Sequence, residues 1–167
     1  KLIMEPFGIH DLLVSALELI KNRIKQKKLH FKFDCLPSIG WMSGDKERLK
    51  QVFYKLLSNS VNFTPPRGHI TLSGKREGES IIIVIDDTGV GIPKDEKVKI
   101  FDAFNKGSSG LRENKQNKEH VSDHEYGIGL GLTIVKRFVE MHSGSLEIKS
   151  RVGRGTKIMC CFPVLQK

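Results

Sequence analysis

Apolar side chains recur about every three to four residues in three stretches of this chain, which is the spacing of a helix with one buried face. The stretches are residues 9–28, 46–63 and 128–142. Asp45 can cap the start of the second helix, the residues TPPRG end it, and Gly144 can cap the end of the third. The predicted inward positions are Leu12, Leu13, Ala16, Leu17, Ile20, Ile24, Leu49, Val52, Phe53, Leu56, Leu57, Val61, Leu132, Val135, Phe138 and Val139.

Apolar and polar residues alternate in shorter stretches, which is typical of half-buried strands. We expect strands at residues 29–35, 40–44, 69–76, 80–86, 145–150 and 155–163, with the residues EGE turning the chain between the third and fourth. Helices and strands in this order predict an α+β two-layer sandwich. In this fold the three helices cover one face of a mixed, mostly antiparallel sheet.

A long polar stretch interrupts this pattern before the third helix. The short amphipathic segment VKIFDAF leads into about residues 105–126, which are rich in Ser, Gly, Asn, Lys and Glu. A loop of this length inside a compact domain is more often a functional lid than a plain connector. We therefore predict a lid here.

Length and composition exclude several classes of protein. A chain of 167 residues predicts one domain spanning residues 1–167. The longest apolar run, residues 81–85, is far shorter than the roughly 20 residues of a membrane helix, and no signal-peptide pattern opens the sequence. The three cysteines have neither a disulfide-framework nor a zinc spacing, so we expect small buried hydrophobes in a reducing compartment.

Lys and Arg outnumber Asp and Glu by 28 to 19, which gives a formal net charge of +9. The basic residues are scattered, and no aromatic residues alternate with them. Even the densest stretch, IKNRIKQKK, would turn its charges to water on a helix. The pattern argues against a nucleic-acid partner and favours a solvated face, although the excess charge also suits a small polyanionic ligand or an acidic partner.

Three polar side chains share one stripe of the second helix. Lys55, Asn59 and Asn62 stand at i, i+4 and i+7. They would be ordinary surface residues on many helices, but Asn is a poor choice for a helix surface. An Asn side-chain oxygen is also a suitable ligand for a Mg²⁺ ion that already holds phosphate oxygens and waters.

The stretch IIIVIDDTGVGIP carries Asp87 from a buried strand into a glycine turn. Its carboxylate could accept a hydrogen bond from the exocyclic amine of adenine and reject guanine, which has an oxygen at that position. Gly89 and Gly91 would let a base approach the backbone closely. Two alternatives are an ordinary turn and an aspartic protease triplet, but a protease predicts a β-rich chain with a second triplet or a symmetric dimer.

The stretch EYGIGLGLTIVK places Gly127, Gly129 and Gly131 at the start of the third helix. Each glycine costs a helix about 1 kcal/mol relative to alanine, so their presence there needs a reason. Backbone amides at a helix N-terminus form a site for phosphates. Lys106, near the start of the lid, can supply a mobile positive charge to the same phosphates.

Taken together, these motifs resemble the catalytic, ATP-binding domain of bacterial sensor histidine kinases. The superfamily also includes gyrase, heat-shock chaperone and mismatch-repair ATPases. RLKQVFYKLLSNSVNFTPPRGHI resembles the asparagine box of the family, DDTGVGIP its first glycine box and IFDAF its phenylalanine box. GIGLGLTIVKRFVEMHSGSLEIKSRVGRGT resembles its second glycine box and the elements that follow. The resemblance covers nearly the whole chain.

The resemblance implies a role for each matching residue. Asn59 would bind Mg²⁺, Asp87 would read adenine, Phe63 and Ile92 would form part of the base pocket, and Lys106 would contact phosphate. Phe101 and Phe104 would anchor the lid. The set expected to contact the nucleotide is Asn59, Asn62, Phe63, Asp87, Gly89, Gly91, Ile92, Lys106, Gly127, Gly129, Leu130, Gly131 and Leu132.

Two positions depart from the family pattern. Lys55 stands where a further Asn is common, and Asn62 stands where a Lys is frequent. The exchange keeps a cation on the stripe, but Lys55 also places an ammonium near the metal and could weaken Mg²⁺ binding. A degenerate kinase that senses nucleotide or docks a protein is therefore the alternative to an active enzyme.

The family transfers the γ-phosphoryl group of ATP to a histidine on a separate helical dimerisation domain, and from there to a response regulator. None of the six histidines here has the phosphoacceptor context. The resemblance thus implies a kinase domain whose phosphoacceptor domain lies elsewhere, monomeric by itself, cytoplasmic and without membrane contact. His120 and His124 have a helical metal spacing within the lid, but no third zinc ligand is evident.

Overall fold

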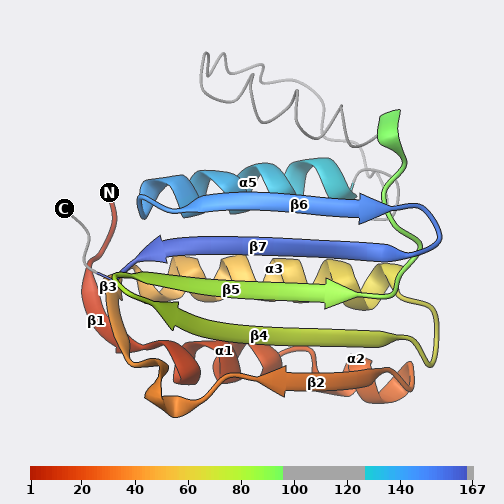
Figure 1. Ribbon diagram of the computed structural model, residues 1–167, viewed down its shortest axis with the longest axis horizontal. Coiled ribbons are helices and arrows are strands. Elements are labelled where there is room, and N and C mark those ends of the chain that lie inside the picture. Colours follow the sequence, from red (N-terminus) through yellow and green to blue (C-terminus); the bar gives the residue numbers. More distant parts are fainter. Residues whose placement is uncertain (96–126, 165–167) are drawn as a thin grey trace, which may run out of the picture.

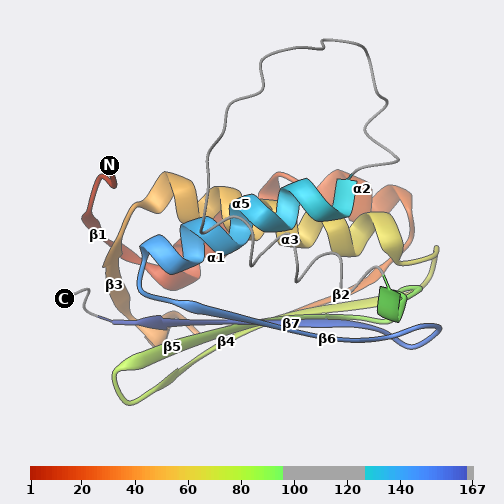
Figure 2. The ribbon, with the colours of Figure 1, turned by 90° about the horizontal axis from the view of Figure 1, so that it is seen from above.

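The computed structural model describes residues 1–95 and 127–164, with residues 127–131 described by their backbone. The described chain forms two layers, in which the helices cover one face of a five-stranded sheet (Figure 2). The predicted α+β two-layer sandwich is therefore confirmed.

The sheet has the strand order β2-β4-β5-β7-β6 (Figure 1). Only β2 and β4 run parallel, whereas the other neighbours are antiparallel. A two-residue turn at Gly78 and Glu79 joins β4 to β5, and Gly78 takes a positive φ of 58° there. The strands are β2 (His30–Asp34), β4 (His69–Glu77), β5 (Ser80–Asp87), β6 (Ser145–Arg151) and β7 (Gly155–Pro163).

A separate two-stranded sheet lies beside the main one and was only half predicted. β3 (Trp41–Gly44) was expected, but it pairs antiparallel with β1 (Glu5–Gly8) rather than with the main sheet. β1 contributes a single buried side chain, Phe7. A four-residue strand that contains a proline carries too little alternation to be detected from the sequence.

The predicted first helix is in fact two helices, α1 (Ile9–Glu18) and α2 (Lys21–Gln26). At the break, the amides of Leu19 and Ile20 donate to carbonyls three residues back instead of four. This tighter turn leaves Leu19 56% exposed and buries Ile20 completely. The helix is interrupted here because the tighter turn directs the Ile20 side chain into the core. A 3₁₀ turn, η1 (Pro37–Ile39), later links β2 to β3.

The two long helices, α3 (Lys46–Phe63) and α5 (Gly127–Met141), follow the prediction closely. Every predicted inward position on them is buried or packed against the core. Asp45 caps α3, because its side chain accepts a hydrogen bond from the Arg48 amide at 3.2 Å. The amide of Asp45 in turn donates to Nε2 of the fully buried His142, at 2.9 Å, just after the end of α5.

The end of α5 corrects one expectation. Ser143, not Gly144, adopts the left-handed conformation after the helix, with φ 56°. The amides of both residues donate to α5 carbonyls in a Schellman motif. Gly144 is required for a different reason, since a Cβ there would lie 2.8 Å from the carbonyl oxygen of Cys161.

The three cysteines are free, and two of them are buried as expected. Burial, with a smaller effect of the neighbouring Cys161, raises the pKa of Cys160 to about 12, so this thiol is unreactive. Cys161 is only half-buried, because the next residue of a strand faces the other side of the sheet.

Candidate functional site

Three elements reach the same end of the molecule, opposite the two termini (Figure 1). They are the last turn of α3, the end of β5 and the beginning of β7. A small cavity of about 30 Å³ lies among them, which is room for about one water molecule. Its lining residues are Asn59, Ser60, Phe63, Asp87, Gly91, Ile92, Leu132, Thr156 and Ile158.

Asp87 is the charged group among the described residues that line this cavity, and it is only 7% exposed. Its Oδ1 accepts hydrogen bonds from the amides of Gly89 and Thr156, at 2.9 and 3.2 Å. Its Oδ2 accepts one from the hydroxyl of Ser60, at 2.8 Å. The carboxylate is therefore held in one orientation by a turn, a strand and a helix.

Burial raises the pKa of the Asp87 carboxyl above its ordinary value. The hydrogen bonds from Gly89, Ser60 and Thr156 oppose this rise because they favour the charged form. The neighbouring Asp86 adds a smaller upward effect. A buried carboxyl with a perturbed pKa in a cavity is a common mark of a functional site.

The two glycines of the turn are needed by the chain itself. Gly91 has φ 74°, and a Cβ there would lie 2.1 Å from the carbonyl oxygen of Arg151. A Cβ on Gly89 would lie 2.7 Å from the carbonyl oxygen of Phe63. Sequence reasoning explained these glycines by close approach of a base, whereas the structure shows close approach of the protein's own backbone. Of the two, Gly91 lines the cavity.

The stripe on α3 divides between two environments. Asn59 and Phe63 line the cavity, and Asn59 is half-buried. Asn62 does not line it, because its side-chain oxygen accepts a hydrogen bond from Arg23 of α2. Arg23 also donates to the Ser58 hydroxyl at 2.9 Å. Lys55 is half-buried one turn before Asn59, outside the cavity lining.

Lys27 also holds the end of α3. Its ammonium donates to the carbonyl oxygens of Val61 and Asn62, at 2.7 and 3.1 Å. Partial burial, followed by repulsion from Arg23, lowers the pKa of Lys27. A cation on the last carbonyls of a helix is stabilising, so Lys27 helps fix the turn of α3 that borders the cavity.

Several predicted site residues lie outside the described residues. These are Lys106, Phe101, Phe104, the lid at about residues 105–126, and the histidine pair His120 and His124. Gly127, Gly129, Leu130 and Gly131 belong to the first turns of α5, where only the backbone is described. Leu132 is buried and lines the cavity, as expected.

Sequence reasoning missed three cavity residues: Ser60, Thr156 and Ile158. Ser60 carried a weak signal, because it follows Asn59 in the unusual run Ser58-Asn59-Ser60. Thr156 and Ile158 carried none, since β7 meets β5 only through long-range pairing, with Thr156 opposite Asp87.

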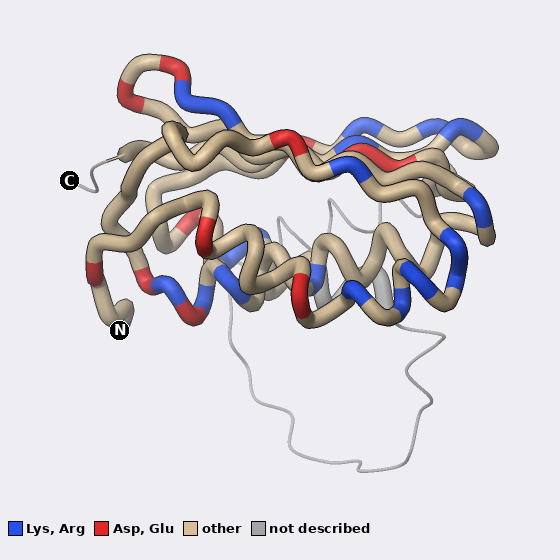
Figure 3. The backbone as a smooth tube through the Cα atoms, turned by 90° about the horizontal axis from the view of Figure 1, so that it is seen from below, with Lys and Arg blue, Asp and Glu red and all other residues tan. Residues whose placement is uncertain are grey.

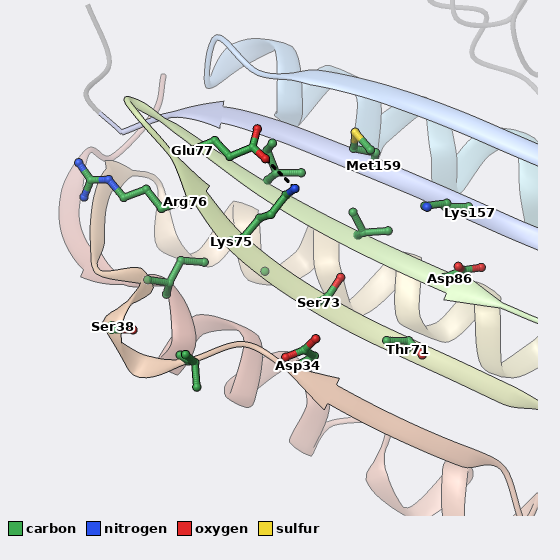
Figure 4. A pocket seen from close by; sticks show the side chains of 15 residues that line it. Asp34, Ser38, Thr71, Ser73, Lys75, Arg76, Glu77, Asp86, Lys157 and Met159 are labelled. Atoms are coloured by element: carbon green, nitrogen blue, oxygen red, sulfur yellow. Dashed lines mark ion pairs between the residues drawn. The ribbon is translucent and has the colours of Figure 1, made fainter.

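A larger hollow of about 920 Å³ lies on the opposite, uncovered face of the sheet (Figure 4). Asp34, Ser73, Asp86 and Lys157 point into it. No predicted site residue lines it, and the described helices lie on the other face of the sheet. Among the described residues, no group of three or more His, Cys, Asp or Glu side chains could hold a metal ion.

Positive charge is concentrated around the end of the molecule that holds the small cavity. Figure 3 shows Lys and Arg gathered opposite the termini, over α2 and the turn between β6 and β7. Acidic residues are more frequent toward the termini. A field of this sign at the mouth of a cavity attracts anions. None of the described helices has the length and apolar character needed to cross a membrane.

The buried carboxylate of Asp87, the glycine turn that follows it and Asn59 on α3 meet at one cavity, which is the arrangement expected of a nucleotide-binding domain of the α+β class. The comparisons with known proteins agree. Residues 44–166 match the family of histidine kinase-, DNA gyrase B- and HSP90-like ATPases. This match covers most of the chain, so the chain belongs to that family.

Histidine kinases are prominent among the relatives. The circadian input-output histidine kinase CikA of Synechococcus elongatus is 31% identical over 163 residues, which are 96% of this chain and 20% of CikA. The sensor histidine kinase YclK of Bacillus subtilis is 34% identical over 161 residues, 93% of this chain and 31% of YclK. The chain thus spans roughly a fifth to a third of these relatives.

Solved structures of histidine kinases share the fold. The catalytic domain of histidine kinase ThkA has a TM-score of 0.76 at 21% identity, covering 98% of this chain and 97% of that domain. Full-length ShkA in complex with AMPPNP has a TM-score of 0.74 at 25% identity, covering 100% of this chain and 32% of ShkA. The architecture is therefore that of an ATP-binding kinase domain.

Proposed function

We propose that this chain is the working catalytic domain of a sensor histidine kinase, which binds Mg-ATP and transfers the γ-phosphoryl group to a histidine. The observation that carries the proposal is Asp87, a buried carboxylate fixed at the floor of the cavity by three hydrogen bonds. A carboxylate accepts hydrogen bonds and donates none, so it matches the exocyclic amine of adenine.

We propose that base binding widens the cavity between the described residues. Its 30 Å³ holds about one water molecule, and a purine is several times larger. Phe63 and Ile92 border the cavity, and Phe63 is 38% exposed, so these apolar walls can separate and then cover the two faces of the ring. Asp87 would remain fixed at the floor while the walls move.

Asn59 is the proposed Mg²⁺ ligand. The donor set fits a cation held mainly by its nucleotide, because Asn59 offers one neutral oxygen and no described acidic cluster completes an all-protein site. When bound, Mg²⁺ would neutralise charge on the phosphates. The N-terminus of α5 and Lys106 are the proposed phosphate contacts, and the remaining chemistry is mainly positioning.

The proposed partners follow from the family. They are a dimerisation domain that carries the phosphoacceptor histidine and a response regulator that receives the phosphoryl group. ThkA, whose fold is similar, is known in complex with a response regulator. We further propose that the domain alone is monomeric and cytoplasmic, and that it contacts neither nucleic acid nor membrane directly.

Lys55 favours a second candidate, a nucleotide-sensing or docking module without turnover. It stands on the stripe of Asn59, one turn earlier, where an ammonium would compete with the metal.

Titration calorimetry with Mg-ATP, Mg-GTP and metal-free ATP separates the candidates. Metal-dependent binding that favours adenine, followed by phosphate transfer to a supplied phosphoacceptor domain, supports the kinase, whereas binding of neither nucleotide contradicts it.

A further inference from the structure

Among the described residues, Ser60 is the one side chain that hydrogen-bonds the Asp87 carboxylate. It is 3% exposed, lies directly after Asn59 on α3 and lines the same cavity. Its hydroxyl oxygen lies 2.8 Å from Oδ2 of Asp87. The other two partners of Asp87 are backbone amides, which can only donate. A hydroxyl differs from them because it can donate or accept.

The acceptor sites of the carboxylate can be counted. A carboxylate has about four lone-pair positions, two on each oxygen. Oδ1 uses both of its positions on the amides of Gly89 and Thr156. Oδ2 uses one on Ser60, which leaves one position for a ligand. Any base read by Asp87 must therefore be read through Oδ2, the oxygen that Ser60 touches.

The acceptor positions already in use also determine which oxygen of Asp87 takes up a proton when the carboxylate becomes neutral. Oδ1 faces two N–H donors, so a proton added to the carboxyl goes to Oδ2. With Ser60 present, the new O–H can turn toward the serine oxygen, which then accepts. Oδ2 thereby keeps a lone pair toward the base in both protonation states. Without Ser60, the O–H can turn only toward the base and offers it a donor.

We propose that Ser60 is a specificity-determining positioning residue, whose hydroxyl keeps the base-facing side of Asp87 an acceptor and so maintains the choice of adenine over guanine. This inference rests on the proposed nucleotide binding at Asp87. Adenine presents an amine donor where guanine presents an oxygen acceptor. A carboxyl that offers an O–H to the base would favour guanine.

The surroundings of Asp87 favour its protonated form, which is the form in which Ser60 would direct the O–H away from the base. Burial raises the pKa of the carboxyl, and the hydrogen bond from Ser60 is among the effects that lower it. Asp86, on β5, is the charged neighbour that acts on it among the described residues. The facing residues of α3, α5 and β7 that line the cavity, Ser60, Leu132 and Thr156, carry no charge.

The test is the ratio of the dissociation constants for Mg-GTP and Mg-ATP, measured by calorimetry on the 167-residue chain at pH 7.5 and pH 5.5. The ratio cancels the titration of the phosphates, which both nucleotides share. For the wild type we expect the ratio to change less than about twofold. For Ser60→Ala we expect the ratio to fall about tenfold at the lower pH, because a protonated Asp87 then offers the base a donor in place of an acceptor.

Two further variants complete the test. Ser58→Ala removes a hydroxyl two residues earlier that accepts from Arg23 and has no contact with Asp87, so its ratio should follow the wild type. Ser60→Cys keeps a weak donor of similar shape, so the ratio should shift in the same direction as in Ser60→Ala, but by a smaller factor. This variant provides the test if Ser60→Ala does not fold. If both Ser60 variants follow the wild type at both pH values, the inference is wrong and the nucleotide site stands. If the wild type binds neither nucleotide, both proposals fall.

Discussion

Asp87→Asn isolates the charge of the proposed base reader with little change of shape. The amide oxygen can take the Oδ1 place and still accept from the amides of Gly89 and Thr156. The amide nitrogen then takes the Oδ2 place, and the Ser60 hydroxyl can rotate to accept from it. The fold should therefore persist, with a stability within about 1 kcal/mol of the wild type.

The base-facing atom, in contrast, changes from acceptor to donor. An adenine amine would then face another donor, and leaving such buried groups unpaired costs about 1–3 kcal/mol. Since 1.4 kcal/mol corresponds to a factor of ten, the affinity for Mg-ATP should fall roughly 5- to 150-fold. Mg-GTP should bind more tightly than it binds the wild type, because its oxygen meets the new donor.

Calorimetric titration of both nucleotides measures this change, and Asp86→Asn is the matched control. Asp86 precedes Asp87 on β5 but points into the hollow on the other face of the sheet, so its loss should leave both affinities nearly unchanged. An Asp87→Asn variant that binds Mg-ATP as tightly as the wild type would refute the assignment of Asp87 as adenine reader.

The pH dependence of stability gives an independent check on the same residue. The folded-state pKa of Asp87 is raised, so its carboxyl costs free energy when it is ionised above that pKa. As pH falls, the folded protein takes up a proton at Asp87 before the unfolded chain does. The cost of the buried charge is then removed, and the free energy of unfolding of the wild type rises. Urea unfolding should therefore show wild-type stability rising relative to Asp87→Asn as pH is lowered from neutral; a gap independent of pH would contradict this reading.

Three more changes test other parts of the structure. Lys55→Asn should raise the affinity for Mg-ATP if the native ammonium opposes the metal at Asn59, and an unchanged affinity in calorimetry would remove Lys55 as an argument for the degenerate kinase. His142→Phe leaves the amide of Asp45 without its buried acceptor, so urea unfolding should show a loss of about 1–3 kcal/mol; a smaller loss would mean that another group replaces the histidine. Thr64→Val removes a buried hydroxyl that has no hydrogen-bond partner among the described residues, so stability should stay level or rise by up to about 1 kcal/mol, and a clear loss would point to a bound water at this hydroxyl.

The sequence predicted most of the fold because its long elements have strong periodicity. α3 and α5 begin and end within about one residue of the prediction, and Asp45 caps α3 as expected. The errors fall where tertiary contacts override local pattern. The break before Ile20 depends on burial in the core, and β1 has only four residues, one of them a proline.

The site was predictable in part, for a similar reason. Asn59, Phe63, Asp87, Gly91, Ile92 and Leu132 were all named from the sequence, and all line one cavity. Their nucleotide roles remain predictions. Thr156 could not be found, because it reaches Asp87 only through the pairing of β5 with β7. The contact between Asn62 and Arg23 depends on how α2 packs on α3, which no local pattern encodes.

The bond between Asp45 and His142 also bears on the proposed widening of the cavity. It ties the start of α3 to the end of α5, whereas the cavity lies between the other ends of the same two helices. Its position makes it a pivot with a long arm, because a helix of 15 residues extends about 22 Å. Leu132, the α5 residue on the cavity, lies ten residues before His142, which is about 15 Å, so parting the walls by about 3 Å there needs a swing of only roughly 11°. The core packing near the pivot would be almost undisturbed, so the entry of a base can be a small rotation rather than a rearrangement of the core.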